Sequence, residues 1–269
     1  MEYSVLMTVY KNDNPEYFKL ALESMINQTK KPDEIVLVND GPIPEVLQNT
    51  INLLNTDGVI KQINLEKNVG LGLALNEGLK ACKNELIARM DSDDISLPSR
   101  CERQVREFEK NPSLDIVGLP VKEFSDNVNN IVGERKVPLT NKEIYQFAKT
   151  RDPFNHPTVM YRKSKVIESG MYGNYRKNQD TDLWIKMLSH DAVCMNISDD
   201  LFRFRFDNNT YKKRKNWENT KLLIDIRKKA WKSGYCSFID FVLVAIAQFG
   251  IYIMPEKFQK LIYTKILRR

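Results

Sequence analysis

The sequence predicts an α/β fold, a mostly parallel sheet flanked by helices, with a helical extension at the C-terminal end. In the first half, apolar segments of strand length alternate with segments of helical spacing, which is the pattern of βαβ units. From residue 211 onward the chain is basic and its apolar residues have helical spacing. We therefore expect a main domain over residues 1–210 and an extension over residues 211–269.

Each element of the first half has its own signal. Apolar runs predict strands, and apolar residues three or four positions apart, such as Phe18, Leu22 and Met25, predict helices. The expected strands are Tyr3–Val9, Glu34–Val38, Val59–Leu65 and Glu85–Met90. The expected helices are Pro15–Asn27, Pro44–Leu54 and Leu71–Ala81. Right-handed crossovers then place helices on both faces of the sheet.

The second half is less regular. The expected helices are Ser99–Lys110 and Asp180–Ser189, and the expected strands are Leu114–Val121, Thr158–Tyr161 and Ala192–Ile197. The polar stretch 126–138 predicts a loop or hairpin. In the extension we expect helices over 213–231, 238–254 and 256–267. The apolar segment 238–254 is interrupted by Asp240 and Gln248, so a buried or interfacial helix is favoured over a membrane span.

The charge distribution and the cysteine and histidine content bear on which partners and metal sites are expected. The net charge is +6, and 16 of the 41 Lys and Arg residues lie in 203–269 with only five acidic residues. The charge of this tail fits an anionic membrane surface or a nucleic acid. RNA binding is the weaker alternative because the tail lacks a recognised nucleic-acid module, so no nucleic-acid partner is expected. Four cysteines without a C-x-x-C pair, and only two histidines, argue against structural zinc. Reduced thiols in a cytoplasmic protein are the simplest interpretation of these cysteines, and the N-terminus has no signal-peptide pattern.

The sharpest motif is Asp91-Ser92-Asp93, directly after an apolar strand. In an extended segment, residues two apart point to the same side, so the two carboxylates converge. A divalent cation such as Mn²⁺ or Mg²⁺ would offset their repulsion and neutralise charge on a departing diphosphate. The alternative is that Asp94 or Ser96 caps the next helix.

Two other strand ends carry weaker signals. Asp40 can accept hydrogen bonds from a base or ribose, but Asn39-Asp40-Gly41 also suits a simple turn. The pair Gly70 and Gly72 partly matches a dinucleotide fingerprint. The third glycine is missing and the preceding strand is the third one, so tight packing at a helix start is the better interpretation.

In combination, these motifs resemble the family 2 glycosyltransferases of the GT-A fold, a Rossmann-like nucleotide-diphospho-sugar transferase fold. The resemblance covers about residues 3–205 and is closest to the amylovoran, capsule and O-antigen subgroup. It rests on an ordered set of motifs: Thr8-Val9-Tyr10, Val38-Asn39-Asp40-Gly41, Asn68-x-Gly70, Ala74-x-Asn76-x-Gly78 and Arg89-Met90-Asp91-Ser92-Asp93-Asp94.

The resemblance implies roles for these residues. Asp93, with Asp91, would hold the metal. The nucleotide-sugar site would be formed by Thr8, Val9, Tyr10, Asp40, Asn68, Gly72, Arg89, Asp91 and Ser92. The reaction would be an inverting transfer of a hexose or N-acetylhexosamine from a UDP-sugar to a glycan, in bacterial surface polysaccharide biosynthesis. The acceptor would be linked to polyprenyl diphosphate, and the protein would lie on the inner face of the membrane.

The resemblance also points to a catalytic base at the start of a later helix. The family's Glu-Asp-x-(Asp/Glu)-Leu-Trp appears here as Gln179-Asp180-Thr181-Asp182-Leu183-Trp184. Asp180 is the expected base and Asp182 its rival. The donor or acceptor sugar would meet His156, Gln179, Asp182 and Trp184, although His156 and Trp184 also suit structural roles. Some relatives place a metal-binding histidine after this helix, where this chain has Arg205 and Asp207 as candidate replacements.

Two other functions remain open at this level. One is a metal-dependent nucleotidyltransferase, which also uses a sheet edge with metal-bound carboxylates. The segment after the first strand lacks the glycine-rich loop expected for that class. The other is a nucleotide-binding module without catalysis, which loss of Asp93 or Asp180 would favour; both aspartates are present.

Overall fold

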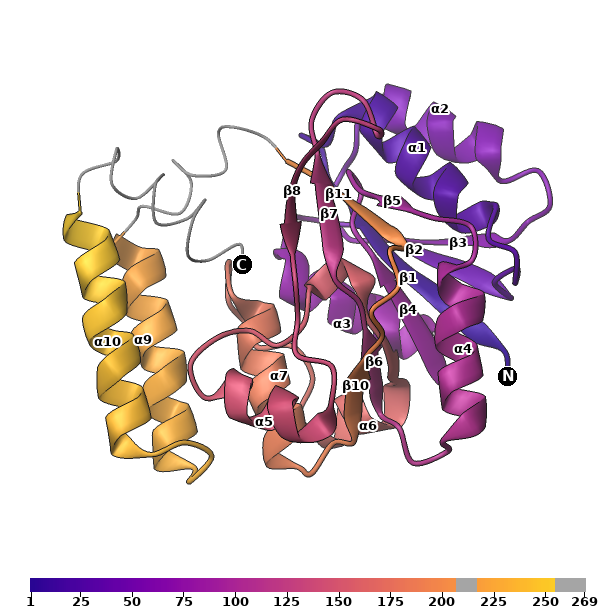
Figure 1. Ribbon diagram of the computed structural model, residues 1–269. Coiled ribbons are helices and arrows are strands. Elements are labelled where there is room, and N and C mark those ends of the chain that lie inside the picture. Colours follow the sequence, from indigo (N-terminus) through magenta and orange to yellow (C-terminus); the bar gives the residue numbers. More distant parts are fainter. Residues whose placement is uncertain (207–216, 255–269) are drawn as a thin grey trace.

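The computed structural model describes residues 1–206 and 217–254, and a seven-stranded sheet lies at its centre (Figure 1). The strand order is β10-β6-β9-β4-β1-β2-β3. The strands are β1 (Tyr3–Val9), β2 (Glu34–Asn39), β3 (Ile60–Asn64), β4 (Leu86–Met90), β6 (Ile116–Gly118), β9 (Met160–Arg162) and β10 (Cys194–Asn196). All pairs are parallel except those of β9 with β4 and β6. The expected mostly parallel α/β sheet is confirmed.

Helices cover both faces of this sheet because the strands alternate their side chains between two cores. Along β1, Val5 and Met7 enter one core and Leu6 enters the other. The first core is closed by α1 (Pro15–Ile26), α2 (Glu45–Leu54) and α4 (Arg100–Lys110). The second is closed by α3 (Leu71–Ala81), α5 (Asn141–Ala148), α6 (Lys163–Glu168) and α7 (Gln179–Ser189).

A smaller four-stranded sheet lies beside the carboxyl end of β4. Its order is β5-β11-β7-β8. The strands are β5 (Ile95–Ser96), β7 (Val121–Phe124), β8 (Ile131–Arg135) and β11 (Phe202–Arg205). β7 and β8 pair antiparallel, which confirms the hairpin expected in the polar stretch. Because β5 directly follows Asp94, this sheet brings distant residues to the metal motif.

The first-half predictions agree with the structure to within one residue at each end. The single strand expected over Leu114–Val121 is wrong, because the chain leaves β6 and enters β7 of the smaller sheet. Pro120 lies in the gap, where it has no N–H to continue a ladder. The helices α5 and α6 and the strands β5 and β11 were not predicted, although Thr140-x-x-Glu143 is a capping-box sequence that marks the start of α5.

Two helices follow the gap in the described chain. α9 (Trp217–Lys232) packs against α10 (Phe238–Ile253), and Ile226 and Ala230 of α9 pack with Ile185 of α7 (Figure 1). The helix expected over 256–267 and the boundary near 210 fall outside the described residues. No helix among the described residues has the length and apolarity that a membrane span needs.

Candidate active site

The polar strand ends meet at one edge of the main sheet. β1 lies between β2 and β4 and is parallel to both, so the residues that follow these strands share one edge. Asp40 lies just beyond β2, and Asp91 just beyond β4. The loop after β1 adds Asp13, which accepts a hydrogen bond from Ser92. The sheet therefore brings together side chains from three separate segments.

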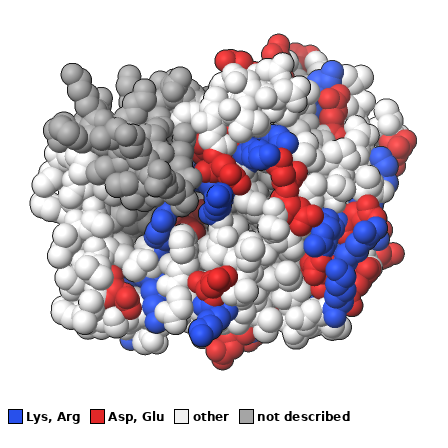
Figure 2. All heavy atoms as spheres, in the orientation of Figure 1, with Lys and Arg blue, Asp and Glu red and all other residues white. Residues whose placement is uncertain are grey.

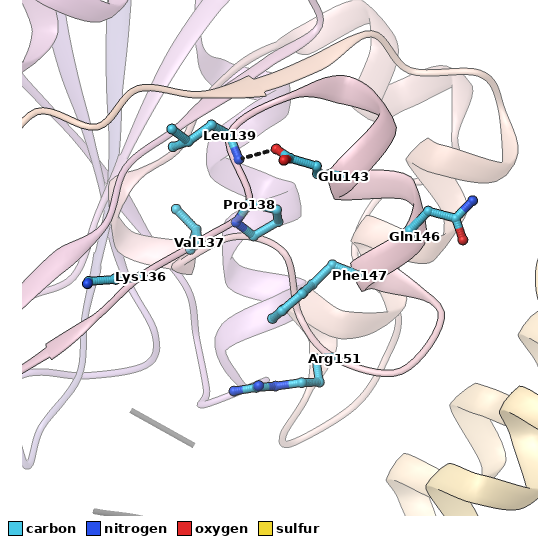
Figure 3. A pocket seen from close by; sticks show the side chains of 8 residues that line it. All are labelled: Lys136, Val137, Pro138, Leu139, Glu143, Gln146, Phe147 and Arg151. Carbon is cyan, nitrogen blue, oxygen red and sulfur yellow. Dashed lines mark hydrogen bonds between the residues drawn. The ribbon is translucent and has the colours of Figure 1, made fainter. Parts of the chain in front are cut away.

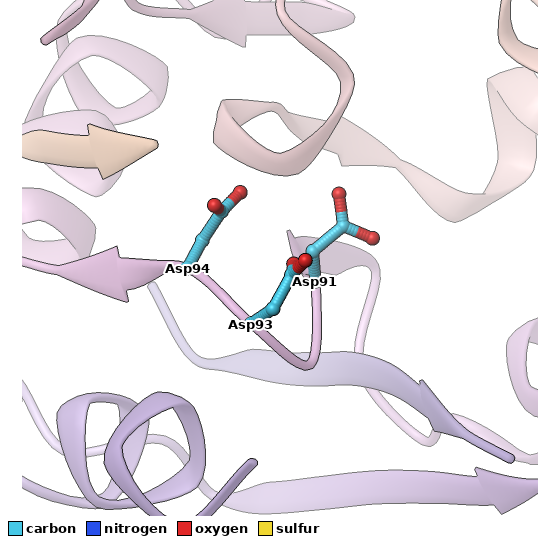
Figure 4. A group of neighbouring side chains, drawn as sticks. All are labelled: Asp91, Asp93 and Asp94. Atoms are coloured by element: carbon cyan, nitrogen blue, oxygen red, sulfur yellow. The ribbon is translucent and has the colours of Figure 1, made fainter. Parts of the chain in front are cut away.

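The turn after β4 carries three carboxylates, from Asp91, Asp93 and Asp94. One oxygen of each lies within 4.8 Å of one oxygen of the other two, and the side chains extend to the same side of the turn (Figure 4). Sequence reasoning expected two of them. Asp94 does not cap a helix: its Oδ1 accepts the backbone N–H of Arg205 at 2.8 Å, and the N-cap of α4 is Ser99. The capping interpretation of Asp94 is therefore wrong.

The electrostatics of this cluster favour a cation. Desolvation by the surrounding protein, and then repulsion by Asp91 and Asp13, raises the pKa of Asp93 to about 6, although part of this side chain is exposed. Burial and the neighbouring Asp93 carboxylate raise the pKa of Asp94 well above its usual value. Asp94 Oδ2 is buried and has no hydrogen-bond partner among the described residues. Clustered oxygen ligands with an unsatisfied buried oxygen fit Mg²⁺ or Mn²⁺.

Arg205 lies against this cluster, at the end of β11. Its Nε donates to the backbone oxygen of Asp93 at 2.8 Å, and its guanidinium lies 3.7 Å from the centre of the Tyr17 ring. A guanidinium has no lone pair for a metal, so Arg205 is no replacement for a metal-binding histidine. It supplies positive charge beside the acidic cluster instead. The other candidate, Asp207, lies outside the described residues.

Arg89 is fully buried on β4 and forms an ion pair with Asp91. Burial alone would lower the pKa of its guanidinium, but Asp91 and then Tyr172 raise it overall. Among the described residues, none of its guanidinium nitrogens has a hydrogen-bond partner of good geometry. Its positive charge also acts to lower the pKa values of His156 and Asp180. This buried position favours a role in orienting Asp91 over direct contact with a nucleotide.

Asp40 anchors the loop between β3 and α3. Its carboxylate accepts hydrogen bonds from Asn68 Nδ2 at 2.8 Å, from the Val69 N–H at 2.7 Å and from the Gly70 N–H at 3.0 Å. Gly70 has a φ of +92°, which favours glycine. Asn68 Oδ1 in turn accepts from Arg176 at 2.6 Å. The predicted nucleotide residues Asp40 and Asn68 are thus in contact, and Asp40 also has a clear structural role.

The remaining predicted nucleotide residues differ in exposure. At the end of β1, Val9 is buried, Thr8 is half-buried and Tyr10 is exposed. An exposed aromatic ring beside the acidic cluster suits stacking on a base. Gly72 is needed for close packing: a Cβ there would lie 2.9 Å from the Gly173 oxygen and 3.1 Å from Gln179 Cβ. It lets α3 approach the segment that leads into α7.

Asp180 lies in the first turn of α7, the helix predicted to carry the base. Burial, and then the charge of Asp152, raises the pKa of Asp180 to about 6, against hydrogen bonds from the backbone at Thr181. A carboxyl group with such a pKa can accept a proton near neutral pH. The rival, Asp182, is buried and forms an ion pair with Lys186 at 2.6 Å. The raised pKa of Asp180 and the ion pair that occupies Asp182 therefore favour Asp180 as the base.

His156 is buried, and so are two residues of α7 itself, Gln179 and Trp184. His156 Nε2 lies 2.9 Å from the hydroxyl of Tyr172, and burial followed by Arg89 lowers the pKa of His156 well below its usual value. The imidazole is therefore neutral. Trp184 packs edge-on against Phe154 and His156. These positions favour structural roles for both rings over direct contact with a sugar.

A separate open groove of about 640 Å³ lies beside α5 (Figure 3). It is lined by Lys136, Val137, Pro138, Leu139, Glu143, Gln146, Phe147 and Arg151. None of these residues belongs to the acidic cluster or to the predicted site. The candidate chemistry therefore lies at the sheet edge and not in this groove.

Comparison with known proteins agrees with this geometry. The family model described as Glycosyl transferase family 2 matches residues 4–170. The chain is 35% identical over 263 residues to the amylovoran biosynthesis glycosyltransferase AmsE of Erwinia amylovora, covering 98% of both chains. It is 35% identical over 268 residues to the UDP-Gal:alpha-D-GlcNAc-diphosphoundecaprenol beta-1,3-galactosyltransferase of Escherichia coli, covering 100% of this chain and 97% of that protein.

Solved structures share the fold at low sequence identity. TarS 1–349 of S. aureus, in complex with UDP-GlcNAc, has a TM-score of 0.66 at 17% identity, over 97% of this chain and 70% of that one. The mannosyltransferase PcManGT of Pyrobaculum calidifontis, in complex with GDP-Man and Mn²⁺, has a TM-score of 0.64 at 11% identity, over 96% and 71%. Both support the expected GT-A fold.

Proposed function

Because this chain belongs to glycosyl transferase family 2, we propose that it transfers a hexose or N-acetylhexosamine from a UDP-sugar to a hydroxyl of a glycan acceptor. The observation that carries the proposal is the meeting of three carboxylates at the end of β4, on the sheet edge where GT-A enzymes are expected to act. Family membership favours sugar transfer over the nucleotidyltransferase and non-catalytic alternatives.

The proposed metal site is formed by Asp93 and Asp91, with Asp94 as a third carboxylate. A bound Mn²⁺ or Mg²⁺ would neutralise negative charge on the diphosphate leaving group. Arg205 stands beside the cluster and would add positive charge at the same place. Arg89 would orient Asp91 through their ion pair. Tyr10, Asp40 and Asn68 would bind the uridine or shape its pocket.

The proposed transfer is a single inverting displacement. The acceptor oxygen bonds to the anomeric carbon as the bond from that carbon to the diphosphate oxygen breaks. The acceptor proton moves to the Asp180 carboxylate, and UDP leaves. Asp180 suits this step because burial and Asp152 raise its pKa to about 6, which makes it a stronger base than an ordinary aspartate.

A panel of UDP-sugars tests this function directly. We expect UDP release in the presence of Mn²⁺ with one or a few of UDP-galactose, UDP-glucose and their N-acetyl forms, and faster release when a glycan acceptor linked to polyprenyl diphosphate is added. Chelation should abolish both rates. No release or transfer with any member of the panel, from folded protein with Mn²⁺, would contradict the proposal.

We also propose that the acceptor is lipid-linked and that the protein works in surface polysaccharide synthesis on the cytoplasmic face of the membrane. The similar Erwinia and Escherichia proteins are named for amylovoran synthesis and for a diphosphoundecaprenol acceptor. A face of α10 would contact the lipid. Its exposed residues are Phe238, Ile239, Leu243, Ile246, Phe249 and Ile253, and the surface over this helix is largely uncharged (Figure 2). Exposed lysines on α9 suit anionic headgroups.

Charging this α10 face should weaken vesicle binding. We expect the double variant Leu243→Asp, Ile246→Asp to bind phosphatidylglycerol vesicles on the order of tenfold more weakly or worse, because two exposed aliphatic side chains can no longer enter the lipid. Co-sedimentation measures this. Leu53→Asp on α2, another exposed leucine, is the matched control and should bind as the wild type does. Equal binding of the double variant would exclude α10 as the contact.

A further inference from the structure

The helix α9 contacts the segment that leads into the catalytic helix. Asn178, which has a φ of +54° and precedes α7, donates its side-chain amide to Asn219 Oδ1 of α9 at 2.8 Å. Lys229 of α9 donates to the hydroxyl of Tyr175. These contacts hold a strained turn immediately before Asp180. The extension therefore touches the base segment and is more than an appended tail.

Arg227 is the buried centre of this contact. Its guanidinium donates to the backbone oxygen of Ala148 and lies 3.6 Å from Asp152 Oδ1. The other oxygen of Asp152 accepts the hydroxyl of Thr181 at 3.0 Å, and Thr181 directly follows Asp180. A continuous polar chain thus runs from α9 through Asp152 to the first turn of α7. Arg227 is only 4% exposed, whereas the Asp152 side chain is 41% exposed, so water screens the pair from the Asp152 side alone.

The polar contacts from Arg227 to α7 matter because several charged groups influence the pKa of Asp180. Asp152 faces Asp180 with like charge and raises its pKa. The positive charge of Arg89 on β4 lowers the pKa of Asp180, and so do hydrogen bonds from the backbone of α7. Tyr172 also lies within electrostatic reach of Asp180. Arg227 lies 3.6 Å from Asp152 Oδ1, so its positive charge opposes the negative charge of this neighbour.

We propose that Arg227 is a positioning residue for the transfer: by pairing with Asp152 it fixes the first turn of α7 and limits the repulsion that Asp180 meets. The inference rests on the proposed function, in which Asp180 accepts the acceptor proton. It assigns the C-terminal extension a part in catalysis that does not depend on membrane contact. It also predicts that the charge of Arg227 helps to set the acidic limit of the enzyme's pH range.

The test compares pH profiles of kcat/KM for Arg227→Met, Arg227→Lys and Lys228→Met. Lys228 is the next residue on α9 and is exposed, so Lys228→Met is the matched control and should follow the wild type. In Arg227→Met the uncompensated Asp152 should move the acidic limb up by about half a pH unit or more, with little change in KM for the UDP-sugar. Arg227→Lys should restore the wild-type limb at least in part.

A double variant separates charge from structure. Asp152→Asn added to Arg227→Met removes the repulsive charge and should return the acidic limb to the wild-type pH or below, which a purely structural role of Arg227 would not predict. Should Arg227→Met fail to fold, Arg227→Gln replaces it in both the single and the double variant with the same expectations, and Asp152→Asn tests the repulsion, because its limb should move to lower pH. An unchanged limb in folded Arg227→Met, or in Asp152→Asn, overturns the inference. Wild-type protein without any transferase activity would instead refute the proposed function.

Discussion

Asp93→Asn should lose transfer by about three orders of magnitude, since stabilisation of a departing diphosphate by a metal is worth several kcal/mol. The substitution removes one of three carboxylates that lie together after β4 and keeps the shape of the side chain. The measurement is kcat with the best UDP-sugar at saturating Mn²⁺. Calorimetry should show that Mn²⁺ no longer strengthens UDP binding.

Thermal unfolding separates this loss from misfolding. In the metal-free protein, desolvation and repulsion raise the pKa of Asp93 to about 6, so the carboxylate that predominates at neutral pH destabilises the folded state. The asparagine removes that repulsion, and we expect a melting temperature equal to or above the wild-type value without metal. Glu77→Gln, an exposed acidic position on α3, is the control and should keep full activity. Near-normal turnover of Asp93→Asn would place the metal elsewhere.

Asp180→Asn should lower kcat by about 10²- to 10⁴-fold, the usual contribution of a general base, while UDP and Mn²⁺ bind normally. Wild-type kcat/KM should fall about tenfold per pH unit below about 6, because Asp180, whose pKa is raised to about 6, must be ionised to accept a proton. The residual activity of Asp180→Asn should lack this limb. Rates over pH 5–8 at saturating Mn²⁺, with UDP titrations at each pH, separate base ionisation from metal loss.

Asp182→Asn is the informative companion to this variant. Asp182 forms an ion pair with Lys186 and is buried, so its substitution should affect stability more than turnover. We expect a loss of kcat below about tenfold, well short of a general-base effect. A loss larger than that of Asp180→Asn would make Asp182 the base and would leave Asp180 as a helix-end residue.

The main sheet and the position of its acidic residues could be predicted from the sequence alone, because the patterns that indicate them lie within single elements. The runs that became β1, β2 and β4 are short and apolar, and the segments between them have helical spacing, so the parallel sheet followed. Parallel neighbours end at the same edge, which placed Asp40 and Asp91 together. The helix carrying Asp180 was likewise predicted from its own residues.

Only the tertiary structure shows which additional side chains contact the site and which candidates are buried in the core. Arg205 reaches Asp93 and Asp94 through the pairing of β11 with the two-residue β5, and so short a strand has no periodicity to recognise. Arg227 reaches Asp152 from a helix whose sequence suggested only a basic surface. Trp184 shows the reverse case, a sugar-binding candidate that packing places in the core. Sequence patterns report contacts along one element, whereas these contacts join segments far apart in the chain.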